Sequence, residues 1–518
     1  MIIRNDRMTV RPQSLVGVAV LAVVALGSST WAQTKGYPGI TKVEWPDTLA
    51  GRWTKEFLEA YHAKDEGALK RFVNTHYSDT YDDREQMLAD WRMQKSAVSE
   101  FRIHAVSTNG EYAVTVTAEA VLPGGKVFGW ASIEIELSPN PPHDPIIIKF
   151  GPGTAPDAKD KAGERRTYDD WKTLQELLER VQQDSGAPGL AVAVMRDGKM
   201  IDKAVVGVRR IDRPGRIRMR DRFHLGSVAK PFTATMIGKL VEDGVLRWDT
   251  TLGEALPGVP MSSEYQGVTL EQLLQHRGGI PTMPTSGEFA GGYPHKPDQT
   301  PAEARAMLVR EIFTEAPVKL GQYSYSNAGY TVAGYMAERV TGRSWEELMR
   351  TLVFKPLKLR SAGFAWPATK ARPKQPYGHS GMPPNFSVQE IGEDVLGDDD
   401  YLSPAGSIHC SIEDLARFAD FHLQGLHGRS GALKAETVRR LHTPPKDGIY
   451  ACGWGVRKTE TGETRHGHSG TAMTFYAMIE TYPDSNLVIV AATNCGPSVA
   501  PFLNEMEEAI YRRMTRED

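Results

Sequence analysis

Ser227 and Lys230 stand three positions apart in the stretch FHLGSVAKPFTATMIGKLVEDG and could supply a nucleophile and its base. Apolar residues recur at helical spacing from Phe232, and Gly244 ends the pattern, which predicts an amphipathic helix. Because proline is tolerated only in the first turn of a helix, Pro231 places this pair at the helix N-terminus. Residues three apart share a helix face, so the hydroxyl and the amine are expected to be neighbours.

A serine hydroxyl is a poor nucleophile until a neighbouring group takes its proton, and Lys230 can take it if its own pKa is depressed. The N–H groups and the dipole of a helix N-terminus also favour a developing oxyanion. A Ser-x-x-Lys pair is a weak signal by itself, since a chain of this length should contain on the order of one by chance. The alternative is an ordinary N-cap serine followed by a solvated lysine.

A second stretch, GQYSYSNAGYTVAGYMAERVTG, adds a phenol and an amide. Tyr325 and Asn327 are predicted to lie in a loop just before a helix. A phenol beside an ammonium is pushed toward phenolate and could relay protons. An amide side chain could orient a substrate carbonyl or amide.

The third stretch, RHGHSGTAMTFYAMIE, places His468, Ser469 and Gly470 at the start of a predicted strand. A glycine there permits a substrate to approach the strand edge closely, and the N–H of Thr471 could face it. Ser469 as the nucleophile of an α/β-hydrolase is excluded, because that fold needs a histidine after the serine and none follows. His466 and His468 lack the further ligands of a metal site, so no metal is expected.

At these three places the sequence resembles the penicillin-recognising serine hydrolases, which include class C β-lactamases, D-Ala-D-Ala carboxypeptidases, and related esterases and aminopeptidases. The motifs are SVAK, YSN and HSG, and the phrases LLQHRGGIP, LSPAGSIHCSIEDLARFA and YACGWGV lie between them in the family's order. The resemblance covers nearly all of the last two-thirds of the chain. It implies a β-lactamase/transpeptidase-like domain of the α/β (α+β) class, with a central antiparallel sheet flanked by helices.

Carried over residue by residue, the resemblance makes Ser227 the acylated nucleophile. Lys230 and Tyr325 would share its proton, and which of them is the base stays open. Asn327 would hold the substrate, and the N–H groups of Ser227 and Thr471 would form the oxyanion hole.

His468 would bind substrate with Ser469 and Gly470, but it stands where many members of the family carry lysine. A histidine is mostly neutral above about pH 6.5, so penicillins and free carboxylates should bind less well than neutral esters or amides. In LLQHRGGIP, Gly278 takes the place of a common serine and is given no role. His276 in the same phrase is expected to be structural.

The expected function is therefore that of an exported serine hydrolase acting on ester, amide or peptide bonds, of esterase, D-aminopeptidase or carboxypeptidase type. Its substrate would be a small molecule or a peptide, and no cofactor is implied. Two alternatives stay open: a true class C β-lactamase, and a binding or sensor protein of the same fold without turnover. The oligomeric state also stays open.

The first 32 residues read as an export signal, with Arg4, Arg7 and Arg11 before an apolar core and cleavage expected after Ala32. Residues 36–152 are predicted to form two helical stretches, roughly Thr48 to Val73 and Asp83 to Ser96, and then an antiparallel meander. They resemble the small NTF2-like α+β fold, whose interior could bind a ligand but is more simply a core.

A polar stretch over residues 153–166 is the predicted linker, and residues 167–518 the hydrolase domain. That domain opens with a helix and a hairpin turning at Asp197-Gly198, and it closes with two strands and a helix. Strands from both ends of a domain predict one antiparallel sheet that joins the termini, with a helical insertion carrying the site.

The composition of the 518-residue chain is that of a globular protein, with 40% hydrophobic and 24% charged residues. The net charge of −3 and the lack of a basic run argue against nucleic acid as a partner. Beyond the signal, no segment is apolar for long enough to predict a membrane span. Cys410, Cys452 and Cys495 are read as packing residues, with one disulfide left open.

Overall fold

The computed structural model divides the chain into two compact units, Met1–Arg165 and Arg166–Asp518. The residues that it describes are 43–63, 65, 67–77, 88, 91, 95, 98–108, 110–121, 127–138, 143, 145–152, 168–282, 284, 287–289, 294, 298–390, 401–459 and 461–515. The predicted signal at residues 1–32 and the predicted linker at residues 153–166 lie outside this set, as does most of a helix predicted over residues 83–96.

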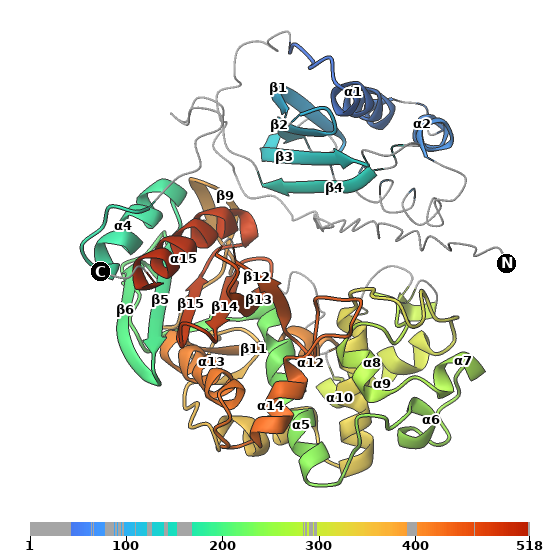
Figure 1. Cartoon of the computed structure of the whole chain (residues 1–518), viewed down its shortest axis with the longest axis vertical. Helices are drawn as coiled ribbons and strands as arrows, with labels where there is room; N and C mark the ends of the chain where they lie inside the picture. Colours follow the sequence, from blue (N-terminus) through green and yellow to red (C-terminus); the bar gives the residue numbers. More distant parts are fainter. Residues whose placement is uncertain are drawn as a thin grey trace, which may run out of the picture. The chain divides into compact units, whose positions relative to one another are not determined.

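The first unit is a small α+β fold in which the helices α1 and α2 precede an antiparallel sheet of order β1-β2-β3-β4 (Figure 1). Its described elements are α1 (Leu49–His62), α2 (Ala68–His76), β1 (Glu100–Thr108), β2 (Ala113–Val121), β3 (Val127–Leu137) and β4 (Pro145–Pro152). The stretch predicted as one helical segment from Thr48 to Val73 forms two helices. The first helix ends at Ala63, whose ψ of 140° is not helical. Phe57 and Val73 pack with Ile133 of the sheet in one apolar core.

The second unit is built on a six-stranded antiparallel sheet of order β12-β13-β14-β15-β5-β6. Its strands are β5 (Gly189–Arg196), β6 (Lys199–Gly207), β12 (Gly455–Lys458), β13 (Thr464–Thr471), β14 (Tyr476–Tyr482) and β15 (Leu487–Thr493). β15 pairs with β5, so the predicted sheet joining both ends of the domain is confirmed. Asp197 and Gly198 of the predicted hairpin both have positive φ, as a type I′ turn requires.

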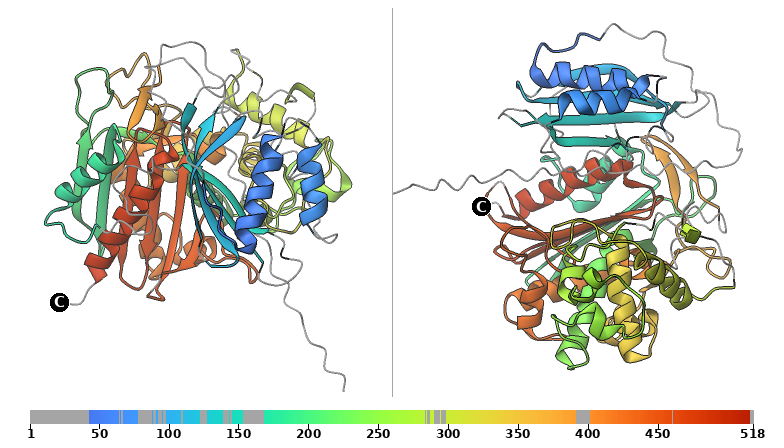
Figure 2. Two further views of the ribbon diagram at one scale, coloured as in Figure 1. Left: turned by 90° about the horizontal axis from the view of Figure 1, so that it is seen from above. Right: turned by 90° about the vertical axis from the view of Figure 1, so that its right-hand side faces the viewer.

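Helices cover both faces of this sheet. Side chains alternate along β5, so Leu190 and Val192 pack with α4 (Leu174–Ser185) and α15 (Ala500–Thr515), as one cluster. Ala191 and Ala193 point to the other face, into the cluster that contains α5 (Ala229–Glu242) and α13 (Ile412–Leu426). The right-hand view of Figure 2 shows α15 in red on one face and the green, yellow and orange helices on the other.

The remaining described elements of this unit lie between β6 and β12, apart from one short helix before α15. The helices are η1 (Gly226–Val228), α6 (Leu252–Ala255), α7 (Ser263–Gln266), α8 (Leu270–Leu274), η2 (Gly287–Phe289), α9 (Pro301–Ile312), α10 (Asn327–Thr341), α11 (Trp345–Met349), η3 (Arg350–Phe354), α12 (Ser403–Gly406), α14 (Ala435–Leu441) and η4 (Pro497–Val499). The short strands are β7 (Arg222–His224), β8 (Gly363–Phe364), β9 (His379–Met382), β10 (Asn385–Val388) and β11 (Ile408–Ser411).

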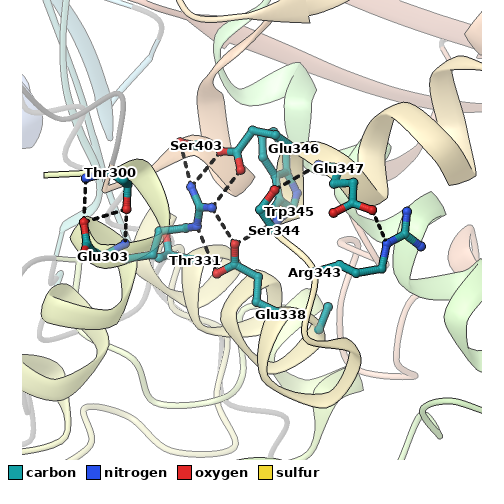
Figure 3. Close-up of polar contacts among 12 residues, drawn as sticks. Thr300, Glu303, Thr331, Glu338, Arg343, Ser344, Trp345, Glu346, Glu347 and Ser403 are labelled. Carbon is teal, nitrogen blue, oxygen red and sulfur yellow. Dashed lines mark hydrogen bonds and ion pairs between the residues drawn. The ribbon is translucent and has the colours of Figure 1, made fainter.

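A buried arginine ties four of these helices together. Arg305 of α9 is fully buried and pairs with Glu338 of α10 at 2.5 Å and with Glu346 of α11 at 2.9 Å. It also donates to the hydroxyl of Ser403 in α12 at 3.3 Å, and Figure 3 shows these three partners around the guanidinium. The network fixes the end of α10 that is remote from Asn327 and the start of α12.

Candidate active site

The first motif lies where η1 runs into α5. Ser227 is in η1, and Lys230 and Pro231 are in the first turn of α5, as the position of the proline predicts. The helix starts three residues earlier than Phe232, and every residue from Ala229 to Gly238 is buried. The prediction that this helix is amphipathic is therefore wrong. α5 lies between the sheet and the other inserted helices, so it has no face toward solvent until its last residues.

The Lys230 amine is fully buried against three oxygen atoms. Nζ lies 2.9 Å from Ser227 Oγ, 2.7 Å from Asn327 Oδ1 and 3.0 Å from the carbonyl oxygen of Ala405. Among the described residues no carboxylate pairs with this amine, and burial lowers its pKa well below the usual value. The predicted proximity of hydroxyl and amine is found.

The three neighbours of Lys230 Nζ are oxygen atoms to which the amine donates: the Asn327 and Ala405 carbonyl oxygens and Ser227 Oγ. An amine that has lost one proton keeps two N–H donors for the two carbonyls and gains a lone pair that can accept the Ser227 proton. Burial favours this form because it lowers the pKa of Lys230. The arrangement therefore suits Lys230 as an acceptor of the serine proton.

The second motif is held by the N-terminus of α10. Asn327 is the first residue of the helix rather than a loop residue, and Ser326 caps it by accepting the Gly329 N–H at 3.0 Å. The Ser326 N–H in turn donates to His276 Nδ1 at 3.1 Å. Tyr325 precedes the cap, and its ring lies 4.3 Å from the His276 ring. His276 thus orients this segment, which agrees with a structural role.

Tyr325 differs from its prediction in one respect. The Lys230 nitrogen lies 4.8 Å from the centre of its ring, yet burial raises the pKa of the phenol above its usual value. A hydrogen bond with Ser227 lowers this pKa only in part. The predicted push toward phenolate is wrong because burial disfavours the charged phenolate more than the hydrogen bond with Ser227 favours it.

The third motif packs its backbone onto the first. A Cβ on Gly470 would lie 2.5 Å from the Ser227 nitrogen, and one on Gly226 would lie 2.5 Å from the Thr471 nitrogen. Both positions therefore require glycine for this close approach, and Gly226 also has a φ of 51°. Ser227 and Thr471 are brought together as predicted, but at the end of β13 rather than at the start of a strand.

His468 is held between two polar partners. Its Nε2 lies 2.9 Å from the Tyr450 hydroxyl, and its Nδ1 lies 2.6 Å from the Ser469 carbonyl oxygen. Burial, and next the nearby Lys230, lower the pKa of His468 to about 3, so the ring is neutral at ordinary pH. Ser469 itself points to the opposite face of β13 and is exposed, away from this group of residues.

Sequence reasoning missed two contributors to the site. Tyr450 hydrogen-bonds His468, and the carbonyl of Ala405 holds the lysine amine. Both lie in phrases that resemble the family, YACGWGV and LSPAGSIHC, which were the only signal that could have found them. A backbone carbonyl carries no side-chain signature, and a tyrosine's partner depends on the fold.

The other candidate chemistries find no support among the described residues. No group of three or more His, Cys, Asp or Glu side chains there is arranged to hold a metal ion. Cys410, Cys452 and Cys495 are free and buried, so the disulfide left open does not form. No helix in the described part of the chain is long and apolar enough to span a membrane.

Residues 174–509 match the protein family described as Beta-lactamase. The chain is 28% identical over 359 residues to "Penicillin-binding protein 4" of Amycolatopsis lactamdurans, an alignment that covers 65% of this chain and 88% of the relative.

Two solved structures share the fold. EstCE1, described as a hydrolase with promiscuous acyltransferase activity, has 18% identity and a TM-score of 0.54 and covers 65% of this chain and 98% of its own. The D-amino acid amidase of Ochrobactrum anthropi SV3, complexed with L-phenylalanine amide, has 18% identity and a TM-score of 0.53. The match covers 66% of this chain and 98% of the amidase chain.

Proposed function

The chain belongs to the β-lactamase family and is a hydrolase of that family, and from this premise we propose that it cleaves neutral esters or amides through an acyl-enzyme on Ser227. The observation that carries the proposal is the buried Lys230 amine, 2.9 Å from the Ser227 hydroxyl and without a carboxylate partner among the described residues. The predicted β-lactamase/transpeptidase-like fold holds for residues 174–509.

In the proposed acylation step, the lone pair of Lys230 Nζ accepts the Ser227 proton while Oγ attacks the substrate carbonyl. Tyr325 is the weaker candidate for the base, since burial favours its neutral phenol. Collapse of the tetrahedral intermediate breaks the ester or amide bond, and the proton held on Nζ passes to the departing alcohol or amine. Water then hydrolyses the acyl-enzyme by the same route in reverse.

The oxyanion of the tetrahedral intermediate would be stabilised by backbone N–H groups. We assign this role to the N–H groups of Ser227 and Thr471, because the glycines at 226 and 470 bring these two backbone segments into contact. Preorganised donors of this kind typically contribute about 10²–10³ in kcat each. Asn327 remains the proposed substrate ligand, since its amide nitrogen is free of the lysine that holds its oxygen.

The neutral-substrate preference rests on His468. With its pKa lowered to about 3, the ring offers no positive charge where many family members place a lysine. A charged hydrogen bond to a carboxylate contributes about 1.5–3 kcal/mol, so penicillins and peptides with a free C-terminal carboxylate should be poor substrates. The D-amino acid amidase that shares the fold was solved with an amide, which is consistent with this class.

Export and the NTF2-like resemblance of the first unit are also proposals. The Arg-rich start and short apolar core of residues 1–32 support secretion, and helices packed on a four-stranded meander support the resemblance. A true class C β-lactamase and a non-turnover sensor remain the alternatives, and the intact hydroxyl, amine and amide of the first two motifs favour an enzyme over a sensor.

The test is to treat the full chain with a fluorophosphonate and, separately, with a labelled penicillin, and to map each adduct by mass spectrometry. The proposal expects the phosphonate on Ser227, no adduct on Ser469, and steady turnover of a reporter ester. An adduct on Ser469, or ester turnover that survives in Ser227→Ala, would contradict it. A single burst of product without turnover would instead identify the sensor.

A further inference from the structure

Four buried side chains form a continuous chain of hydrogen bonds beside the site. The Thr235 hydroxyl donates to the Pro231 carbonyl at 2.7 Å and lies 2.9 Å from His422 Nε2. His422 Nδ1 lies 3.0 Å from His442 Nε2, and His442 Nδ1 lies 3.2 Å from His466 Nδ1. All four side chains are buried, the most exposed being His466 at 8%.

The hydrogen bonds connect β13, which carries Thr471, with α5, which directly continues the short helix η1 that carries Ser227. Thr235 lies in α5 and contacts the carbonyl of the residue that follows Lys230. His466 lies in β13, two residues before His468. The two intervening histidines come from α13 and from the residue that ends α14. None of the four takes part in the proposed chemistry.

Hydrogen-bond capacity fixes the direction of every link. The single proton of the Thr235 hydroxyl goes to a carbonyl, so the hydroxyl must accept from the Nε2–H of His422. The Nδ1 of this neutral ring then accepts from the Nε2–H of His442, whose own Nδ1 accepts from the Nδ1–H of His466. One protonation pattern alone satisfies all four bonds, with Nε2–H on His422 and His442 and Nδ1–H on His466.

The surroundings hold the rings neutral. Burial lowers the pKa of His422 to about 3 and that of His466 to about 4. Burial, and next the other two rings, lower the pKa of His442 well below its usual value. The Trp454 ring stacks on His442 with centroids 4.3 Å apart. Its neighbour Gly453 meets the backbone of Lys230 and Pro231, where a Cβ would lie 2.8 Å from the Pro231 nitrogen.

We propose that the chain Thr235–His422–His442–His466 positions β13 against α5 and so sets the spacing between the Ser227 and Thr471 backbone nitrogens. This role rests on the proposed function. The chain does not serve as a proton relay, because its α5 end is a peptide carbonyl that cannot take up a proton. Its four members are therefore positioning residues, and none is catalytic.

The first arm of the test does not depend on any activity. The full chain is labelled with ¹⁵N-histidine, and ring signals are assigned by replacing His422, His442 and His466 one at a time. The proposal expects neutral rings with Nε2–H on the first two and Nδ1–H on the third. A different tautomer on any of the three overturns the chain, whether or not the protein proves to be a hydrolase.

The second arm separates positioning from bulk stability. Thr235→Val keeps the side-chain shape and removes the hydroxyl, whereas Thr235→Ser keeps the hydroxyl. His442→Leu removes both ring bonds, whereas His442→Gln can still donate to one neighbour and accept from the other. His427, which lies exposed at the end of α13, supplies the control His427→Leu.

Thr235→Val and His442→Leu are expected to lower kcat on a neutral ester roughly tenfold or more with KM little changed, and to shift the amide NMR signals of Gly470 and Thr471. The Ser and Gln variants should recover most of both effects, and the His427→Leu control should show neither. Equal kcat across all five at a temperature where each is folded, with unshifted amide signals, overturns the positioning role. If the parent has no ester activity the proposed function fails, and the amide signals alone decide the positioning role.

Discussion

Lys230 and Arg305 are both fully buried basic side chains of the same unit, and both contact α10 and α12, but their partners differ. Lys230 donates to Asn327 Oδ1 at the first residue of α10 and to the Ala405 carbonyl oxygen in α12, which are both uncharged. Arg305 contacts Glu338 near the other end of α10 and Ser403 in α12, with Glu346 as a second carboxylate. Among the described residues, Lys230 therefore has no carboxylate partner and Arg305 has two.

The difference separates a reactive group from a structural one. Without a carboxylate, burial lowers the pKa of Lys230, whereas the pKa of Arg305 is raised because its two carboxylates outweigh burial. A buried charge that is paired stays charged and can hold helices in place. A buried amine without a carboxylate partner gives up its proton more readily, which makes it a better candidate for a base.

The largest effect on stability should come from breaking the paired cation. Arg305→Met leaves the buried Glu338 and the half-buried Glu346 without a counter-charge, which should lower the free energy of unfolding by about 3–5 kcal/mol. Denaturant unfolding of the full chain, followed by tryptophan fluorescence, measures this loss.

Arg343, which pairs with Glu347 on the surface in the same view of Figure 3, supplies the matched control. Arg343→Met should cost only about 0.3–0.5 kcal/mol, because exposed ion pairs contribute little. Equal losses in the two variants would show that Arg305 is not the structural member of the comparison.

A smaller effect, on substrate preference, should follow from placing a new positive charge beside Lys230. His468→Lys adds a permanent positive charge where the neutral ring now hydrogen-bonds Tyr450. It should improve kcat/KM for a substrate acid relative to its methyl ester by roughly ten- to a hundredfold, the value of one charged hydrogen bond. An unchanged acid-to-ester ratio, with the parent already preferring the acid, would mean that another residue reads the carboxylate.

The sequence predicted which residues of the site lie together better than it predicted their electrostatics. The proximity of Ser227 and Lys230 follows from helix spacing and from Pro231 alone, and the joining of distant strands follows from the order of hairpins and helices. By contrast, the shift of the Tyr325 pKa depends on burial on all sides, which no local pattern encodes. Burial of α5 between two layers was missed for the same reason.

Contacts between residues far apart in the sequence also could not be predicted. The Ala405 carbonyl, 175 positions from Lys230, and the Tyr450 hydroxyl reach the site only through the packing of α12 and of the segment before β12. The chain of buried histidines joins residues from four elements, and nothing in the spacing of His422, His442 and His466 indicates it. Such contacts are properties of the tertiary fold and need coordinates.

The central claim is that Lys230 is a neutral base, and its titration tests this most directly. The full chain is labelled with ¹³C at lysine Cε, and the Lys230 signal is identified by its loss in Lys230→Met. Burial disfavours the charged form, so this signal should titrate below the value of about 10.4 expected of exposed lysines.

Below the midpoint of this titration Lys230 is protonated and cannot take the serine proton. The rate of fluorophosphonate labelling at Ser227 should therefore fall with the same midpoint as pH is lowered, and Lys230→Met should label about 10²–10⁴-fold more slowly. A Lys230 signal that titrates with the exposed lysines, or a Ser227 labelling rate that does not follow it, would contradict the account.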